Sequence, residues 1–128
     1  MSKVVVLAHA PCAAALVQAA EGVLGRSIDL TVIDVPMQQP RNALPVLQAR
    51  VQALGADQCV ILTDLPGSTP HRMALETIDK SRGAVVTGIN LAMLIRAINY
   101  IDLGTNELAA RCQDIGVRSI ELSDTHAV

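Results

Sequence analysis

Short, strongly apolar segments that alternate with helix-like segments restrict the fold of this chain more than any other feature. The segments KVVVLA, CVILT and AVVTG are apolar almost throughout. Such strands are typical of parallel sheets with helices on both faces, because a strand with one face in water alternates between apolar and polar residues. These three are predicted to be central, whereas IDLTVID alternates more and is placed nearer the edge. We predict strands at residues 3–8, 28–35, 58–63, 84–87 and 117–122.

Apolar residues recur at helical spacing between these strands. The first stripe follows Pro11 and stops at Gly25, as expected for a helix with proline at its start and glycine just past its end. Thr69 with Pro70 is predicted to form the N-cap and first turn of the third helix, and Asn90 the N-cap of the fourth. We predict five helices: one after Pro11 that stops at Gly25, one from Leu44 that ends at Gly55, one from Thr69 that ends before Gly83, one after Asn90 to Ile98, and one after Thr105 to Gly116.

Strands that alternate with helices imply right-handed crossovers and a mainly parallel sheet. The predicted fold is therefore α/β: a three-layer, doubly wound sheet with helices on both faces and the common order 2-1-3-4 for the first four strands. The length of 128 residues is within the usual size of one domain, and we expect residues 1–128 to form a single domain.

The composition excludes several classes of protein. The chain has no Trp or Phe, only one Tyr, and a net charge of −2 with Lys and Arg scattered, so no surface for nucleic acid is expected. No apolar run approaches the roughly 18 residues that suggest a membrane span, and the N-terminus lacks the pattern of a secretory signal. We therefore expect a cytoplasmic protein that does not insert into a membrane.

Polar residues directly follow the first and third predicted strands. In an open α/β sheet the ligand site lies beyond the carboxyl ends of the strands, where the strand order reverses. The order 2-1-3-4 places AHAP and DLPGSTP on either side of that point, so His9 and Asp64 are predicted to face each other. A carboxylate that accepts the proton of one imidazole nitrogen fixes the tautomer and leaves the lone pair of the other nitrogen free to attack or bind.

The turn before the third predicted helix has the composition of an anion site. Gly67, Ser68 and Thr69 are small, so their N–H groups can turn toward a ligand, and a helix N-terminus favours negative charge. A histidine, a carboxylate and an anion cradle together indicate a histidine that carries a phosphoryl group. Purely structural interpretations stay open: His9 as a loop histidine, Asp64 as a strand-ending residue, and Thr69 as a cap alone.

Other polar residues are weaker candidates. Asn90 is placed on the rim of the same cleft, His71 lies in the first turn of the third predicted helix, and His126 lies in the C-terminal tail. A metal site needs three or four ligands in a cluster, so neither a metal nor any other cofactor is predicted. The cysteines are far apart and form no CxxC pair, which predicts reduced, mostly buried thiols; they are Cys12, Cys59 and Cys112.

Three segments match a known pattern in order. KVVVLAHAPCAAALVQAAEGVLG has a strand, a histidine before a small residue, and a helix that ends in Gly after Leu. CVILTDLPGSTPHRMA has a strand that ends in Asp, a turn with Gly, and Ser or Thr before Pro, and TGINLAMLIRAI has Gly, an apolar residue and Asn before a leucine-rich helix. Over nearly its whole length the chain resembles the EIIA domain of the mannose/fructose/sorbose class of the bacterial sugar phosphotransferase system.

The resemblance implies specific roles and partners. His9 would be the phosphorylation site, which accepts the phosphoryl group from the phosphocarrier HPr and passes it to an EIIB component without a metal. Asp64 would hold the other ring nitrogen, while Thr69 and the preceding loop amides would contact the phosphoryl oxygens. The resemblance also implies a homodimer in which the last strand, residues 117–122, is antiparallel and exchanged between subunits.

The sequence departs from the family near the reacting ring. Ala10 and Ser68 stand where family members often have glycine, and Pro66 replaces an aromatic residue. Ala and Ser can still donate backbone N–H groups unless the turn needs a positive φ. Two other functions stay open: a regulatory module in which phosphorylation of His9 changes binding to a target protein, and a flavodoxin-like binder of a small ligand. The second lacks both GxGxxG and GxxxxGK[ST].

Overall fold

The computed structural model describes residues 3–55, 58–78 and 82–124. This part of the chain contains a sheet of four parallel strands in the order β2-β1-β3-β4, as predicted. The strands are β1 Val4–His9, β2 Thr31–Val35, β3 Val60–Thr63 and β4 Ala84–Val86. The helices are α1 Cys12–Leu24, the 3₁₀ helix η1 Pro40–Ala43, α2 Leu44–Leu54, α3 Thr69–Thr77, α4 Leu91–Asn99 and α5 Thr105–Arg118.

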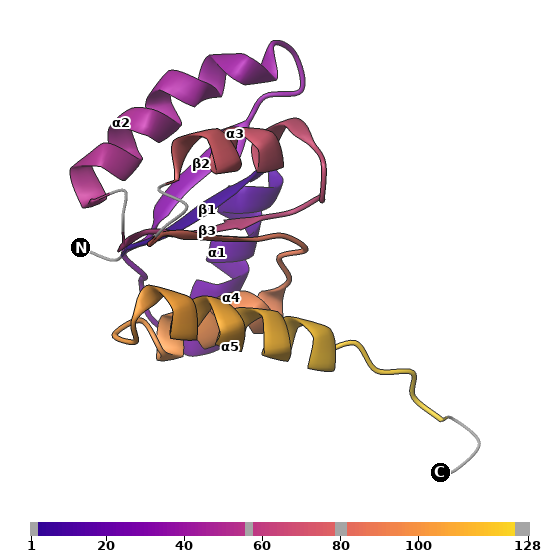
Figure 1. The fold of residues 1–128 in the computed structure, drawn as a ribbon. Coiled ribbons are helices and arrows are strands. Elements are labelled where there is room, and N and C mark those ends of the chain that lie inside the picture. Colours follow the sequence, from indigo (N-terminus) through magenta and orange to yellow (C-terminus); the bar gives the residue numbers. More distant parts are fainter. Residues whose placement is uncertain (1–2, 56–57, 79–81, 125–128) are drawn as a thin grey trace.

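The sheet lies between two layers of helices (Figure 1). Side chains alternate along a strand, so Val4, Val6 and Ala8 of β1 pack in one core with α1, α4 and α5. Val5 and Leu7 pack in the other core with α2 and α3. Both faces of β1 are therefore buried, which explains why its sequence is apolar without interruption.

Most predicted strands are longer than the observed ones. The second strand was predicted from residue 28, but β2 begins at Thr31, which pairs with Val5 near the start of β1. Ile28 and Leu30 instead pack as partly buried residues against the core that contains α1. Because both residues are apolar, the sequence predicted a strand here. In the structure they belong to the segment before β2 and cover the edge of this core.

Two predicted helix boundaries are wrong in ways that matter for the site. Thr69 was predicted to be the N-cap of the third helix, but the N-cap position belongs to Ser68 and Thr69 is the first helical residue. The hydroxyl of Ser68 makes no capping bond and donates to the carbonyl of Leu65 instead. The same helix was expected to continue toward Gly83, but α3 ends at Thr77.

The predicted last strand, residues 117–122, does not form in the described chain. Val117 lies in the last turn of α5, which continues to Arg118, and residues 119–124 have no regular secondary structure. Gly116 was expected to end the helix, yet it is buried within it. A Cβ at Gly116 would lie 2.7 Å from Cε of Met93, so the glycine leaves room for that side chain between α5 and α4.

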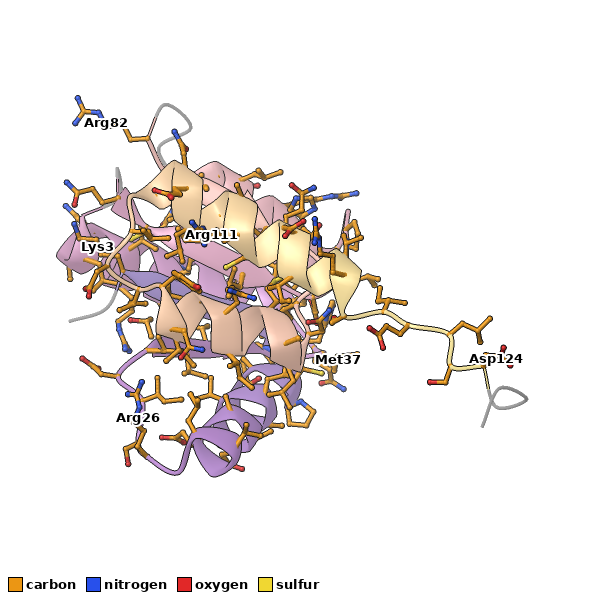
Figure 2. All side chains as sticks on the ribbon, turned by 90° about the horizontal axis from the view of Figure 1, so that it is seen from below. Lys3, Arg26, Met37, Arg82, Arg111 and Asp124 are labelled. Carbon is orange, nitrogen blue, oxygen red and sulfur yellow. The ribbon has the colours of Figure 1, made fainter. Side chains whose placement is uncertain are left out.

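The tail after α5 extends away from the body of the molecule (Figure 1). Its apolar side chains are in solvent: Ile120 is 79% exposed and Leu122 100% exposed. Figure 2 shows Asp124 far out on this tail and places Lys3, Arg26 and Arg82 at the opposite end of the molecule. His126 lies outside the described residues.

Candidate functional site

His9 is the last residue of β1 and lies at the carboxyl edge of the sheet. The residues before it are fully buried, whereas the side chain of His9 is 29% exposed. In the register of the sheet, His9 pairs with Val35 at the end of β2, and Leu7 pairs with Thr63 at the end of β3. Asp64 follows Thr63 directly, so the predicted neighbours reach the same edge.

The structure brings His9 and Asp64 into direct contact. Nδ1 of His9 lies 2.8 Å from Oδ2 of Asp64, and the backbone N–H of His9 donates to the same oxygen at 2.9 Å. The other oxygen, Oδ1, accepts the backbone N–H of Leu65 at 2.8 Å. The carboxylate therefore has three donors, two of them from His9.

These contacts fix the chemical state of the pair. Burial raises the pKa of the Asp64 carboxyl, but the hydrogen bonds from the His9 backbone, the His9 ring and Leu65 outweigh burial and hold that pKa below its ordinary value. Because an ionised carboxylate only accepts hydrogen bonds, Nδ1 of His9 carries the proton. In the neutral ring the lone pair is then on Nε2, which is the nitrogen available to a phosphorus atom or another electrophile.

A second carboxylate at this edge was not identified from the sequence. Oδ1 of Asp34, in β2, accepts the N–H of Ala13 at 2.8 Å, and Oδ2 accepts the N–H of Ala14 at 3.3 Å. It thus caps the N-terminus of α1 from another strand, since Pro11 at the N-cap position makes no side-chain cap. The available signal was an acidic residue inside a half-buried strand next to the predicted site.

Ala10 and Pro11 connect His9 to α1. The N–H of Ala10 donates to the carbonyl of Val35 at 2.9 Å, which continues the β1–β2 ladder one residue beyond His9. The Ala10–Pro11 peptide bond is cis. Neither Ala10 nor Ser68 has a positive φ, because Gln39 is the one non-glycine residue of the described chain with that conformation. Alanine and serine therefore fit where the related family often has glycine.

Residues 65–68 form a tight turn between Asp64 and α3. The N–H of Ser68 donates to the carbonyl of Leu65 at 3.2 Å, Pro66 and Gly67 occupy the two central positions, and Gly67 has a φ of 79°. Proline followed by glycine at positive φ is the signature of a type II turn. The N–H of Gly67 donates to Nδ1 of His71 at 2.9 Å. Two of the N–H groups predicted to bind an anion, those of Gly67 and Ser68, thus already have acceptors.

The N-terminus of α3 still offers donors to an anion. The first hydrogen bond of the helix runs from the N–H of Arg72 to the carbonyl of Ser68. The N–H groups of Thr69 and His71 come before it, whereas Pro70 has no N–H. With the hydroxyl of Thr69 they form a smaller donor set than the sequence predicted, placed five residues or more after the carboxylate that contacts His9.

Asn90 was predicted to cap the fourth helix, and it does. Its Oδ1 accepts the N–H of Met93 at 2.9 Å, while its Nδ2 donates to the carbonyl of Gly116 at 3.1 Å. The loop before it is attached to the site, because the N–H of Gly88 donates to the carbonyl of Asp64 at 2.9 Å. Oδ1 of Asn90 thus caps α4 itself, whereas Nδ2 joins the start of α4 to α5.

His9 lies at the carboxyl edge of the sheet with 29% of its side chain exposed. One hollow of the described surface lies at the opposite edge of the sheet and is lined by Lys3, Arg26, Asp29 and Asp102 among others. No group of three or more His, Cys, Asp or Glu in the described ranges could hold a metal ion. Over the same ranges, no helix is both long and apolar enough to cross a membrane.

Comparisons with known proteins agree with this geometry. The sequence family described as the fructose IIA component of the PTS system, EIIA-man, matches residues 3–112. Among solved structures, the chain is similar to the mannose/sorbose specific IIA subunit of the phosphotransferase system from Enterococcus faecalis. That similarity has a TM-score of 0.87 at 25% identity and covers 96% of this chain and 95% of that chain.

Other solved structures share the fold at lower identity. The phosphotransferase system component EIIA from Streptococcus agalactiae has a TM-score of 0.77 at 21% identity, with 100% of both chains covered. A sigma-54 interaction domain protein from Enterococcus faecalis has a TM-score of 0.66 at 19% identity, covering 91% of this chain and 90% of that chain. The comparison with curated proteins gives no match.

Proposed function

Because the chain belongs to the family of fructose IIA components of the sugar phosphotransferase system, we propose that it is a phosphoryl carrier. It accepts a phosphoryl group on His9 from HPr and passes that group to an EIIB component. The observation that carries the proposal is the contact of Nδ1 of His9 with Asp64 at 2.8 Å, at an exposed edge of the sheet.

The transfer needs little covalent help from the protein. The lone pair on Nε2 of neutral His9 attacks the phosphorus of phosphorylated HPr in line. As the new N–P bond forms, the N–P bond of HPr breaks and its electron pair returns to the HPr imidazole. The ring of His9 becomes positively charged while Nδ1 keeps its proton, and the carboxylate of Asp64 faces that charge. Transfer to EIIB repeats these steps with His9 as the leaving group.

The donors of α3 neutralise the transferring oxygens. The N–H groups of Thr69 and His71 and the hydroxyl of Thr69 are the candidates, supported by the position of these groups before the first hydrogen bond of the helix. The positive ends of these N–H and O–H dipoles stabilise the negative phosphoryl oxygens, and the Asp64 carboxylate stabilises the positive charge on the His9 ring. Most of the catalysis is positioning, as in phosphoryl transfer generally.

Apolar side chains beside the site support docking of a protein partner. Met37 follows the end of β2 and is 73% exposed, and Leu65 follows Asp64 and is 59% exposed. Exposed apolar side chains next to an open site fit a protein partner better than a small polar substrate. HPr and EIIB would cover His9 in turn and exclude water during transfer.

Phosphorylation in vitro tests the proposal directly. The chain is incubated with phosphoenolpyruvate, enzyme I and HPr, and mass spectrometry of peptides, under conditions that preserve phosphohistidine, locates the added phosphate. We expect it on His9 in the native protein and nowhere in the His9→Gln variant, while His126→Gln serves as a histidine control that keeps the label. Acid-labile phosphate on the His9→Gln variant would show that another residue is the carrier.

We also propose that the chain forms a homodimer through its tail. Within the described residues, β4 pairs with β3 alone, so one side of β4 is free for another strand. A groove beside that side is lined by β4 and α5, including Val85, Thr87 and Ala109. The exposed Ile120 and Leu122 alternate with Glu121, which suits a strand that adds to the β4 edge of a second copy.

The mass of the protein in solution tests the homodimer. Light scattering after size-exclusion chromatography should give twice the mass of the chain. Deletion of residues 119–128 removes the proposed contact and should give the mass of one chain. The deletion leaves α5 complete, because this helix ends at Arg118. A truncated protein that remains dimeric would exclude the tail as the source of the association.

A regulatory module is the second candidate, because the same fold occurs in a sigma-54 interaction domain protein. In this case phosphorylation of His9 changes binding to a target protein and no sugar is transported. Both candidates fit a protein of the cytoplasm. Transfer of labelled phosphate from the protein to a candidate EIIB supports the carrier, whereas a target captured only by one phosphorylation state, with no transfer, supports the regulator.

A further inference from the structure

We propose that His71 is a positioning residue for phosphoryl transfer, which acts by holding the turn between Asp64 and α3 in one of its two peptide orientations. The inference rests on the proposed function, since it assigns a role in that same site. It starts from one contact: Nδ1 of His71 accepts the N–H of Gly67 at 2.9 Å.

The contact defines the state of the His71 ring. A nitrogen that accepts a hydrogen bond has a free lone pair, so Nδ1 carries no proton and the proton of the neutral ring is on Nε2. This is the opposite tautomer from His9, whose Nδ1 donates to Asp64. The two histidines at this edge thus have distinct and measurable ring states.

The contact also selects the geometry of the turn. In a four-residue turn the central peptide has two orientations, type I and type II, which differ by rotation of that peptide by about 180°. Here the central peptide joins Pro66 to Gly67, and the φ of 79° at Gly67 belongs to the type II form. The N–H of Gly67 is the N–H of this peptide, so an acceptor at its hydrogen keeps the peptide in the type II orientation.

The turn is where the two halves of the site are joined. Asp64, which orients His9, precedes it, and Thr69, which offers its N–H and hydroxyl to the phosphoryl group, follows it. Asp64 is already fixed by bonds from His9 and Leu65, and Ser68 by its bonds to the carbonyl of Leu65. Among the described residues, the bond to His71 is the one that holds the central peptide directly, so His71 restrains the link between the two halves of the site.

Variants of His71 separate an acceptor role from simple packing. His71→Ala removes the acceptor, and we expect the single-turnover rate of transfer from phosphorylated HPr to fall about 2- to 10-fold, the range of one neutral hydrogen bond. His71→Asn is the matched variant, because Oδ1 of Asn lies at the same distance along the side chain as Nδ1 of His and accepts a hydrogen bond. It should restore the rate to within about twofold of the native rate.

Gly67→Ala provides a double-mutant test. Alanine disfavours a positive φ, so this variant should move the turn toward type I and lower the rate by itself. If His71 acts through Gly67, adding His71→Ala to Gly67→Ala should lower the rate by less than twofold more. Fully additive losses would overturn the proposal.

Nuclear magnetic resonance measures the contact itself. The ring nitrogens of His71 should show Nδ1 without a proton, and the amide proton of Gly67 should exchange faster with water in His71→Ala than in the native protein or in His71→Asn. Nδ1 of His71 found protonated would overturn the proposal, as would a His71→Ala variant with the native rate. Absence of transfer to the native protein is a different result, because it would reject the carrier function while the ring and amide measurements still report the contact.

Discussion

Replacement of Asp64 by asparagine removes one negative charge and, in the orientation that keeps both bonds to His9, the acceptor for the N–H of Leu65. Two N–H groups face Oδ2 of Asp64 and one faces Oδ1. The amide oxygen of the introduced asparagine would therefore take the place of Oδ2, because that orientation satisfies both donors of His9. The proton stays on Nδ1 of His9, and the lone pair on Nε2 stays available. Asp64→Asn thus tests the charge of the carboxylate without changing the nucleophilic nitrogen.

The magnitude follows from the geometry of the pair. A hydrogen bond to a charged group contributes about 1.5–3 kcal/mol, and a neutral one about 0.5–1.5 kcal/mol. The side chains of His9 and Asp64 are 29% and 20% exposed, so water screens the pair and the upper end of a Coulomb estimate does not apply. Since asparagine keeps the neutral bond, the loss in the charged transition state is about 1–2 kcal/mol, which slows transfer roughly 5- to 30-fold.

Single-turnover transfer from phosphorylated HPr measures this effect. Rapid mixing over a range of protein concentrations separates the maximal rate from the concentration at half-maximal rate. We expect Asp64→Asn to lower the maximal rate and to leave the half-maximal concentration within about twofold, because the carboxylate faces His9 rather than the partner.

Asp34→Asn is the matched control. Asp34 is also a carboxylate at this edge of the sheet and accepts two backbone N–H groups, but those groups belong to α1 and not to His9. Its replacement should lower the free energy of unfolding by about 0.5–2 kcal/mol as a weakened cap, with a smaller effect on transfer than Asp64→Asn. A native maximal rate for Asp64→Asn, or equal losses in the two variants, would refute the role given to the charge of Asp64.

Three further predictions concern stability and reactivity. Because the folded pKa of Asp64 is lowered, the unfolded state binds more protons near and below the ordinary pKa of about 3.9. The free energy of unfolding, measured by urea titration, should therefore decrease as the pH is lowered through this range, and less steeply in Asp64→Asn. Asn90→Ala loses the bonds to Met93 and Gly116, and urea unfolding should show a loss of about 1–2 kcal/mol. A thiol reagent should label exposed Cys12 in the native protein but not Cys112, whose pKa burial raises to about 11.

The strand order and the His9–Asp64 contact could be predicted because both depend on pattern rather than detail. Uninterrupted apolar segments identify buried parallel strands, and the ends of neighbouring parallel strands meet at one edge. Once the order 2-1-3-4 is chosen, His9 and Asp64 have no freedom to be far apart, since each is at the end of a central strand. No side-chain conformation had to be known.

The internal bonds of the 65–68 turn could not be predicted in this way. Which N–H groups of Gly67 and Ser68 face a ligand depends on the orientation of single peptides, and that orientation follows from His71 and Leu65. Likewise, Asp34 caps α1 although it lies about 20 residues later in the sequence. Capping is predicted from residues next to the helix start, so this contact could not be foreseen. Side-chain to backbone bonds of this kind depend on distances that are set only after the elements pack.

A glycine that is expected to end a helix can instead be present for packing. Gly116 was interpreted as a helix end, but α5 continues through it, and the side chain of Met93 from α4 occupies the space where a Cβ would be. A single sequence shows only that glycine is present, not whether it supplies conformational freedom or the absence of a side chain. Because the end of the helix was misplaced, the predicted last strand overlaps α5 at Val117 and Arg118.

The proposed role of His9 as a phosphoryl carrier requires a side chain that is rigid and yet open to its partners. The buried residues of β1 fix the backbone before His9, and the N–H of Ala10 extends the ladder with Val35 beyond it. Asp64 then holds His9 by two bonds, one from its backbone N–H and one from Nδ1 of its ring, and the ring bond orients Nε2 at this open edge. An open site leaves the exclusion of water to the partner, and for this reason we expect replacements of exposed Met37 or Leu65 to weaken docking rather than the transfer step.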